Sequence, residues 1–463
     1  MSEPTPTDGS TSPRAARLSR GLLGAAGLCF VAYSLFALQL SRSTTMKVVP
    51  ALIGVLLFAA LRLRPAVRVN VALVVVPIVL VLHGFELYLG RLKPPPASAA
   101  ARAGRTFDAR SRWEVVHDLR KERPGATVAL QPKTVIELLR GPLQVGAQPT
   151  IPLGGIASVP TVYCNEGGQW SIYEADERGF NNPKGLWDTG EIEVGIVGDS
   201  YTHGACVQQE EGYPAALRRR HPRTISLGMG GNGPLLELAG IREYLAPLKP
   251  KVVVWSYFRN DMPDLEVEKR FPALMAYLDR AHVQGLLGRQ AQLDEALVRL
   301  LETHKGSVHT WPPLLGGVGL DRRSSPIWLQ DLVMGEDNSA AAAAIRLDQI
   351  TRMAAAGAGA MSFKPDFELF KRVLGVARDE VAAWGGKLYF VYIPDMLTLG
   401  KVRKVHPLRE QVLRSAGEVG LPVIDVAPSF EAEPDLESLQ WNPTSHCNPK
   451  GYAHIARVIE EAL

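Results

Sequence analysis

The sequence predicts an α/β domain, a parallel sheet covered by helices on both faces, preceded by an all-α transmembrane segment. From residue 193 to the carboxyl terminus, short β-branched apolar runs alternate with amphipathic helical stretches, which is typical of a parallel sheet. Near the amino terminus, residues 21–40 form an uncharged apolar run long enough for a membrane span. At 463 residues the chain is long enough for a large α/β domain with accessory parts.

The α/β pattern can be followed element by element. The strand runs are short and apolar, as in strands covered on both faces. The helix expected from residue 234 opens with Pro234 at a favourable first position. We expect strands at 193–197, 223–229, 251–258, 387–394 and 421–426, and helices at 211–221, 234–245, 367–385, 406–420 and 450–463.

Two stretches fit this pattern less well. Residues 264–361 read as a mostly helical insertion, and residues 107–188 carry scattered glycine and proline with no clear periodicity. The end of the second stretch, DERGFNNP at 176–183, suits a turn or β element leading into the core. We therefore predict one domain, 107–463, with an insertion.

The remaining boundaries lie before that domain. Residues 1–19, rich in Ser, Thr and Pro, are expected to be a disordered tail, and residues 91–106 a linker. The transmembrane segment, 20–90, has spans expected at about 21–40, 48–63 and 69–89. A cleaved signal peptide is the alternative for the first run, but that run exceeds a usual signal core.

Arginines suggest an orientation for this segment. Arg14, Arg17 and Arg20 precede the first span, and Arg62, Arg64 and Arg68 follow the second, which favours cytoplasmic placement of both groups. Three spans would then put the α/β domain outside the cytoplasm, anchored in the cell (inner) membrane. If the middle run does not span, the domain lies inside.

Composition excludes several classes of protein. Hydrophobic residues make up 46% and charged residues 21%, so the chain is neither disordered nor fibrous. The net charge is +4, but the arginines are scattered, and no nucleic-acid partner is expected. The four cysteines have no zinc spacing, and we expect no metal and no cofactor. Cys164, Cys206 and Cys447 could include one disulfide in an exported domain, but the sequence does not pair them.

Gly198-Asp199-Ser200 ends the first expected strand of the sheet. One interpretation is a strand-to-helix turn in which Asp199 or Ser200 caps the helix. The other is a nucleophilic serine at the carboxyl edge of the sheet, where open α/β sheets place their sites. The second interpretation requires a general base and donors for an oxyanion.

Two later segments offer those groups, each with an alternative. LGMGGNGP at 227–234 fits a dinucleotide-binding loop only weakly, since no acidic residue follows at the usual distance. Instead, one of its glycines could bring a backbone N–H to a reacting oxygen. His446 lies in a polar turn before the last helix. It is either a surface residue or the base for Ser200.

Two further motifs, Arg-Asn-Asp at 259–261 and Ser-His-Cys-Asn at 445–448, accompany Gly-Asp-Ser and the glycine loop. The order of these four motifs along the chain resembles that of the SGNH (GDSL-type) hydrolase superfamily. The resemblance covers about 176–263 and 362–463 and implies a flavodoxin-like sheet. It implies that Ser200 is the nucleophile and His446 the base. The N–H groups of Ser200 and Gly231 and the amide of Asn260 would form the oxyanion hole. DERGFNNP also resembles a segment of membrane-anchored envelope members.

One position departs from the family. Its members usually carry an aspartate two or three residues before the histidine, where this chain has Thr444 and Pro443. Such an acid holds the imidazole in its working tautomer. Support for His446 is expected instead from Asn442, Thr444 or a backbone carbonyl, or from Asp435 or Glu437 reaching back. Asp199, beside the nucleophile, is a further supporting candidate.

The expected function is a membrane-anchored extracytoplasmic serine esterase that removes O-acyl groups, chiefly acetyl, from a cell-envelope glycan. Its partners would be that glycan and the lipid bilayer. One alternative is a glycan O-acyltransferase, which would need a membrane partner to supply acyl groups. Another is a non-catalytic glycan-binding or assembly protein on the same fold, which the missing aspartate would favour.

Overall fold

The structure, a computed structural model, describes residues 12–40, 44–77, 100–101, 104–110, 112–305, 365–395, 408–441 and 446–463. The chain divides into two compact units. Of the described residues, the first unit holds those up to residue 77, and the second holds those from residue 100 to the carboxyl terminus apart from residue 305.

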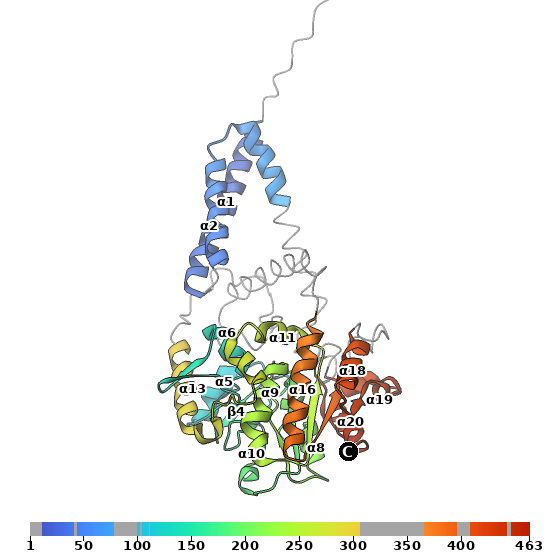
Figure 1. The fold of residues 1–463 in the computed structure, drawn as a ribbon. Coiled ribbons are helices and arrows are strands. Elements are labelled where there is room, and N and C mark those ends of the chain that lie inside the picture. The colour runs from blue at the N-terminus through green and yellow to red at the C-terminus, as the bar shows by residue number, and fades with distance from the viewer. Residues whose placement is uncertain are drawn as a thin grey trace, which may run out of the picture. The chain divides into compact units, whose positions relative to one another are not determined.

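The first unit contains α1 (Pro13–Leu40), α2 (Thr44–Ala60) and a helical stretch at 65–77 (Figure 1). Glycines let α1 and α2 pack closely, because a Cβ on Gly54 would lie 3.0 Å from the carbonyl oxygen of Gly27. Arg68 is buried and donates hydrogen bonds to the Ser19 hydroxyl and the Ala16 carbonyl. Arg68, one of the arginines predicted to mark the cytoplasmic side, therefore joins the helical stretch to α1.

The helices of this unit bear on two predictions. α1 begins at Pro13, inside the predicted disordered tail of residues 1–19, because the Ser12 hydroxyl accepts from the Ala15 N–H and Pro13 suits the first turn. Among the described residues, no helix combines the length and the apolarity needed to cross a membrane. The spans predicted at 21–40, 48–63 and 69–89 are therefore not confirmed, and residues 78–89 lie outside the described part.

The second unit is built on a five-stranded sheet in the order β10-β9-β8-β6-β7, and every neighbouring pair is parallel. The prediction of a parallel α/β sheet is confirmed. Gly198 at the end of β6 pairs with Ser256 of β8, so these two strands end at the same edge. The strands are β6 (Val194–Gly198), β7 (Thr224–Ser226), β8 (Val252–Tyr257), β9 (Lys387–Tyr392) and β10 (Val423–Asp425).

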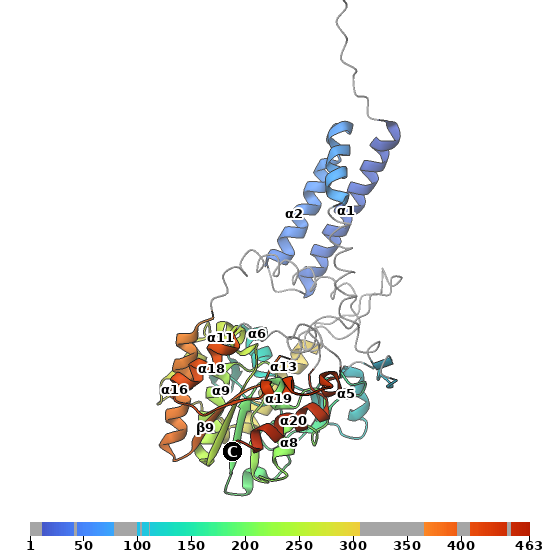
Figure 2. The same cartoon turned by 90° about the vertical axis from the view of Figure 1, so that its right-hand side faces the viewer.

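Helices cover both faces of this sheet. On one face α8 and α20 lie side by side over a core that includes Ile196 and Val254 (Figure 2). On the other face α9 packs beside α16, and Gly195 allows Leu245 to approach the strand closely. The helical elements are α7 (Ser200–His203), α8 (Tyr213–Leu217), α9 (Pro234–Gly240), η2 (Ile241–Leu245), α10 (Ala246–Leu248), α16 (Phe367–Ala383), α18 (Arg409–Glu418), α19 (Ala427–Glu431), η5 (Leu436–Leu439) and α20 (Pro449–Glu460).

Of the predicted insertion, 264–361, the structure describes residues 264–305, which are mostly helical; the rest lies outside the described residues. This part packs on the sheet-covering helices through buried Arg242, which donates to the Tyr277 carbonyl and pairs with Glu380. The elements are α11 (Asp261–Glu268), α12 (Pro272–Met275), η3 (Ala276–Leu278), η4 (Leu286–Gly288) and α13 (Gln290–Lys305).

Residues 107–188, for which the sequence predicted little, carry regular structure. β1 pairs in parallel with β4, β4 pairs antiparallel with β5, and β2 and β3 form a hairpin. The turn at 176–183 joins this region to the main sheet, because Asn182 exchanges hydrogen bonds with both backbone groups of Ser226. The elements are α5 (Arg112–Arg120), β1 (Thr127–Val128), α6 (Pro132–Leu139), β2 (Leu143–Val145), β3 (Gln148–Thr150), β4 (Pro160–Val162), β5 (Ile172–Glu174) and η1 (Leu186–Asp188).

Candidate active site

Ser200 stands at the carboxyl end of β6, as the first residue of α7. Position 198, two residues before Ser200, must be glycine because a Cβ there would lie 2.1 Å from the Thr202 hydroxyl oxygen. The Asp199 carboxylate accepts from the Tyr201 N–H at 3.0 Å and caps α7. The two interpretations of Gly-Asp-Ser are therefore compatible: Asp199 forms the cap, and Ser200 opens the helix with its own N–H at the helix amino terminus.

His446 lies against Ser200, although 246 positions separate them in the chain. Its Nε2 atom is 3.0 Å from the Ser200 hydroxyl oxygen. The histidine side chain is 27% exposed and packs beside the Tyr201 ring. This geometry suits a base that removes the serine proton.

Glu166 supplies the carboxylate that the sequence did not locate. Both its oxygens lie 3.2 Å from Nδ1 of His446, and Oε2 also accepts from the His446 backbone N–H at 2.8 Å. With Nδ1 protonated toward Glu166, Nε2 is free to accept from Ser200. Burial alone would lower the pKa of His446, but the charges of Glu166 and Asp199 outweigh it and raise that pKa.

The supports predicted for His446 have different outcomes. Asn442 and Thr444 lie outside the described residues. Asp435 accepts from the Ser438 N–H and caps η5, and Glu437 is exposed. The prediction that Asp435 or Glu437 reaches back is replaced by Glu166, which approaches from the loop between β4 and β5. The Oδ2 atom of Asp199 is 3.4 Å from the Ser200 hydroxyl oxygen, and the charge of Asp199 contributes to the raised pKa of His446.

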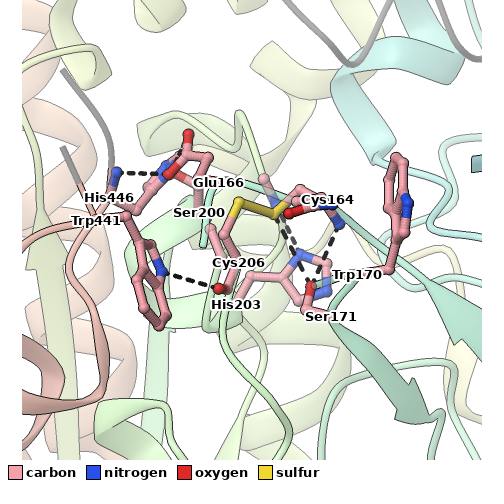
Figure 3. The surroundings of a disulfide bond; sticks show 12 residues. Cys164, Glu166, Trp170, Ser171, Ser200, His203, Cys206, Trp441 and His446 are labelled. Carbon is pink, nitrogen blue, oxygen red and sulfur yellow. Dashed lines mark hydrogen bonds and ion pairs between the residues drawn. A yellow bond between two sulfur atoms is a disulfide. The ribbon is translucent and has the colours of Figure 1, made fainter. Parts of the chain in front are cut away.

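Glu166 is tied to the nucleophile by a disulfide. Cys164 and Cys206 are bonded, which places a covalent bridge two residues before the acid and six after Ser200 (Figure 3). Glu166, Cys206 and His446 are close enough to form a three-ligand metal site among the described residues, but the Cys206 sulfur is held in the disulfide. Cys447 is a buried free thiol.

The loop that contains Gly231 is fixed by buried His203. The Gly230 N–H donates to Nδ1 of His203 at 3.2 Å, and Nε2 of the same ring lies 3.0 Å from the Tyr173 hydroxyl. Burial lowers the pKa of His203 to about 3, so the ring stays neutral and Nδ1 can accept. Gly231 has φ +75°, a left-handed conformation that favours glycine. The loop thus brings this backbone to the same sheet edge as Ser200.

Asn260 follows β8 and stands between two carboxylates. Its amide donates to Asp264 at 2.8 Å, and Asp264 is in turn paired with Lys133 of α6. Burial raises the pKa of Asp199 to about 6, although hydrogen bonds from the Tyr201 N–H and from Asn260 oppose that rise. Asn260 therefore lies beside the residue that precedes Ser200, but both of its amide hydrogens are directed at carboxylates, so donation to an oxyanion would require one of them to be released.

The glycine loop does not suit a dinucleotide. At the start of α9, the Glu268 carboxylate accepts from the N–H groups of Gly233 at 2.7 Å and Leu235 at 2.8 Å. A bound pyrophosphate would need such N–H groups at a helix amino terminus. Here a buried side chain already occupies them, so the dinucleotide alternative is not supported.

Comparison with protein families matches residues 196–454 to the GDSL-like Lipase/Acylhydrolase family. The chain belongs to this family. It is therefore an SGNH-type ester hydrolase. The predicted membership of the SGNH (GDSL-type) superfamily is confirmed. The accessory region that supplies Glu166 precedes the matched residues.

The chain also has similarities to solved structures, each with a TM-score below 0.5. The chain is similar to a G-D-S-L family protein from Desulfitobacterium hafniense DCB-2, at 13% identity over 59% of this chain and 100% of that one (TM-score 0.32). An acetyl xylan esterase matches at 12% identity over 59% and 100% (TM-score 0.30). A lipase/acylhydrolase from Enterococcus faecalis matches at 13% over 58% and 95% (TM-score 0.29). No curated protein matches the chain.

Proposed function

We propose that this hydrolase removes O-acyl groups, chiefly acetyl, from a glycan of the cell envelope. The observation that carries the proposal is the hydrogen-bonded chain from Ser200 through His446 to Glu166. In an acyl-ester hydrolase, such a chain activates the serine and stabilises the imidazolium that forms.

The reaction follows from these contacts. The Ser200 oxygen attacks the ester carbonyl while its proton passes to Nε2 of His446. The tetrahedral oxyanion would be held by the N–H groups of Ser200 and Gly231, and by the amide of Asn260 once it releases one of the carboxylates it donates to. His446 then gives its proton to the departing glycan oxygen, which leaves an acyl-serine. Water attacks that ester with His446 as base, and the carboxylic acid and free Ser200 are released.

A cavity at the far end of the loop that carries Glu166 supports a substrate larger than a simple ester, and its lining includes none of Ser200, His446 and Glu166. It measures about 420 Å³ and lies against the same loop that carries Glu166. Aromatic and polar side chains line it, including Phe107, Trp170, Gln169 and Asp108. Aromatic faces and hydrogen-bonding groups together suit a sugar ring, which has apolar C–H faces and polar edges.

The proposed location is outside the cytoplasm, with the amino-terminal segment as anchor. The disulfide supports this, because such bonds persist in oxidising compartments. The uncharged run at 21–40 supports an anchor. A reporter that works only outside the cytoplasm should be active when fused after Leu463. Activity of a cytoplasm-only reporter at that position would overturn the proposed location.

The substrate test uses the purified full chain with a chromogenic acetyl ester and an acetylated polysaccharide. We expect turnover of both, and Trp170→Ala should raise KM for the polysaccharide about tenfold while leaving the small ester within twofold. Equal effects on both substrates would argue against the cavity as a glycan subsite. Acetate transfer to an added glycan in place of release to water would make the protein an acyltransferase.

A further inference from the structure

We propose that Arg105, Trp441 and the disulfide Cys164–Cys206 form a clamp that positions Glu166 against His446. We call these four residues the clamp. The inference rests on the proposed roles of Ser200, His446 and Glu166 and adds residues that touch no reacting atom. They act as positioning residues, because the disulfide, the Trp441 indole and Arg105 each bridge two of the three segments that carry those groups.

The need for positioning follows from where Glu166 lies. It occupies the loop between β4 and β5, outside regular structure, and its partner His446 is 280 positions away in the chain. An acid two residues before the histidine is held by its short tether. Glu166 has no such tether, so tertiary contacts must offset the entropy of fixing its loop.

The disulfide makes the covalent part of the clamp. It connects the loop of the acid to the turn after α7, with the two Cα atoms 5.0 Å apart (Figure 3). Cys206 adopts φ +61°, an uncommon left-handed conformation for a residue other than glycine. Because only one residue separates Cys164 from Glu166, the acid has little freedom to leave the nucleophile segment.

Arg105 and Trp441 add the base segment. Arg105 donates one hydrogen bond to the Gly167 carbonyl at 2.7 Å and another to the Trp441 carbonyl at 3.0 Å, and its guanidinium lies over the Trp441 ring. The indole N–H of Trp441 donates to the Cys206 carbonyl at 3.0 Å. The same ring covers Gly167, where a Cβ would lie 2.8 Å from Cε2. Acid, base and nucleophile segments therefore meet at one indole.

Other contacts of the loop have different partners. Asn165 accepts from the Gly168 N–H and donates to the Asp108 carbonyl, which holds the loop to the segment around residue 108. Gln208 donates to the Trp170 carbonyl at the far end of the loop. These bonds should keep the loop folded when the clamp is cut, so its removal is expected to displace Glu166 without unfolding the domain.

The readout that separates positioning from stability is the pH profile. His446 must be neutral to act as base, and the charged groups that act on it are Glu166 from this loop and Asp199 at the end of β6. Moving Glu166 away removes the larger of these two effects on the pKa of His446. The acidic limb of kcat should then shift to lower pH, which a merely structural role would not produce.

The test compares the Cys164→Ser/Cys206→Ser double variant with the wild-type full chain, each with and without Glu166→Gln. We expect at least a tenfold fall in kcat with KM within about threefold, and an acidic limb at lower pH. In the Glu166→Gln background, loss of the disulfide should change kcat by less than twofold. An unchanged kcat and pH profile in the folded double variant, or an equal loss in both backgrounds, would overturn the proposal.

A second pair of variants applies if the double variant fails to fold. Trp441→Phe keeps the ring over Gly167 and removes the donor to Cys206, whereas Trp384→Phe removes a similar donor to the Pro250 carbonyl, away from the clamp. We expect a lower kcat and a shifted acidic limb for Trp441→Phe only. The same kcat and the same pH dependence of kcat in Trp441→Phe and Trp384→Phe would overturn the proposed role of the clamp. Failure of the proposed function is distinct, since the wild-type chain would then turn over no ester.

Discussion

Replacing Glu166 with glutamine keeps the size of the side chain, removes the charge that faces His446 and changes what the group can donate to Nδ1. The amide oxygen of glutamine can still accept from the His446 backbone N–H, as Oε2 of Glu166 does at 2.8 Å. The amide N–H, however, would face Nδ1 and favour the tautomer protonated at Nε2. That tautomer cannot accept the Ser200 proton.

The size of the effect can be worked from the contacts. Nδ1 lies 3.2 Å from each carboxylate oxygen, and the two side chains are 27% and 15% exposed. With charge centres about 4.5 Å apart and an effective dielectric constant of about 20, their attraction is about 4 kcal/mol. Solvent screening leaves about 2–3 kcal/mol for the transition state, which is roughly 30- to 150-fold in kcat. With the wrong tautomer added, we expect a loss of about 10²- to 10³-fold.

The assay is the pH dependence of chromogenic acetyl ester hydrolysis by the full chain. Activity falls as the pH drops through the pKa of His446, because only the neutral ring is a base. Glu166 raises that pKa, so the acidic limb of Glu166→Gln should lie at lower pH than that of the wild type. Glu210→Gln, which changes an exposed carboxylate, serves as control and should stay within twofold. A folded Glu166→Gln protein with wild-type kcat and an unshifted limb would refute the reasoning.

Three further predictions concern the same site. Ser200→Ala should abolish ester turnover while the melting temperature stays within a few degrees; turnover in the folded variant would exclude Ser200 as nucleophile. Asn260→Ala should lower kcat about 10²- to 10³-fold with little change in KM, and a change confined to KM would make Asn260 a substrate-binding residue. Lys133→Met should lower kcat less than Asn260→Ala does, since Lys133 acts through Asp264. Thr444→Asp should give no gain in turnover because Glu166 already faces His446, and a marked rise would show that an acid is lacking.

The sheet and the two central site residues could be predicted because their signals are local. A buried parallel strand requires a continuous apolar run, and β6, β8 and β9 each have one. Ser200 directly follows β6, and His446 lies in the turn before α20. The parallel pairing of β6 and β8 brings the ends of these two strands, and with them Ser200 and Asn260, to one edge of the sheet.

Glu166 could not be predicted by the same reasoning. It lies in a loop of the region 107–188, whose strands have only two or three residues and no readable period. Its partner is distant in sequence, and no local rule joins them. The pair Cys164 and Cys206 would have been the signal, since its bridge connects the loop of Glu166 to the turn after Ser200, but spacing alone does not pair cysteines.

The most direct test of the account is labelling of the purified full chain with a fluorophosphonate, followed by mass spectrometry of its peptides. The reagent forms a stable phosphoester with a serine only where a neighbouring base activates the hydroxyl. The account predicts one adduct, on Ser200, formed at least tenfold more slowly in Glu166→Gln and His446→Ala. An adduct on another serine, or none in the folded wild-type chain, would contradict it.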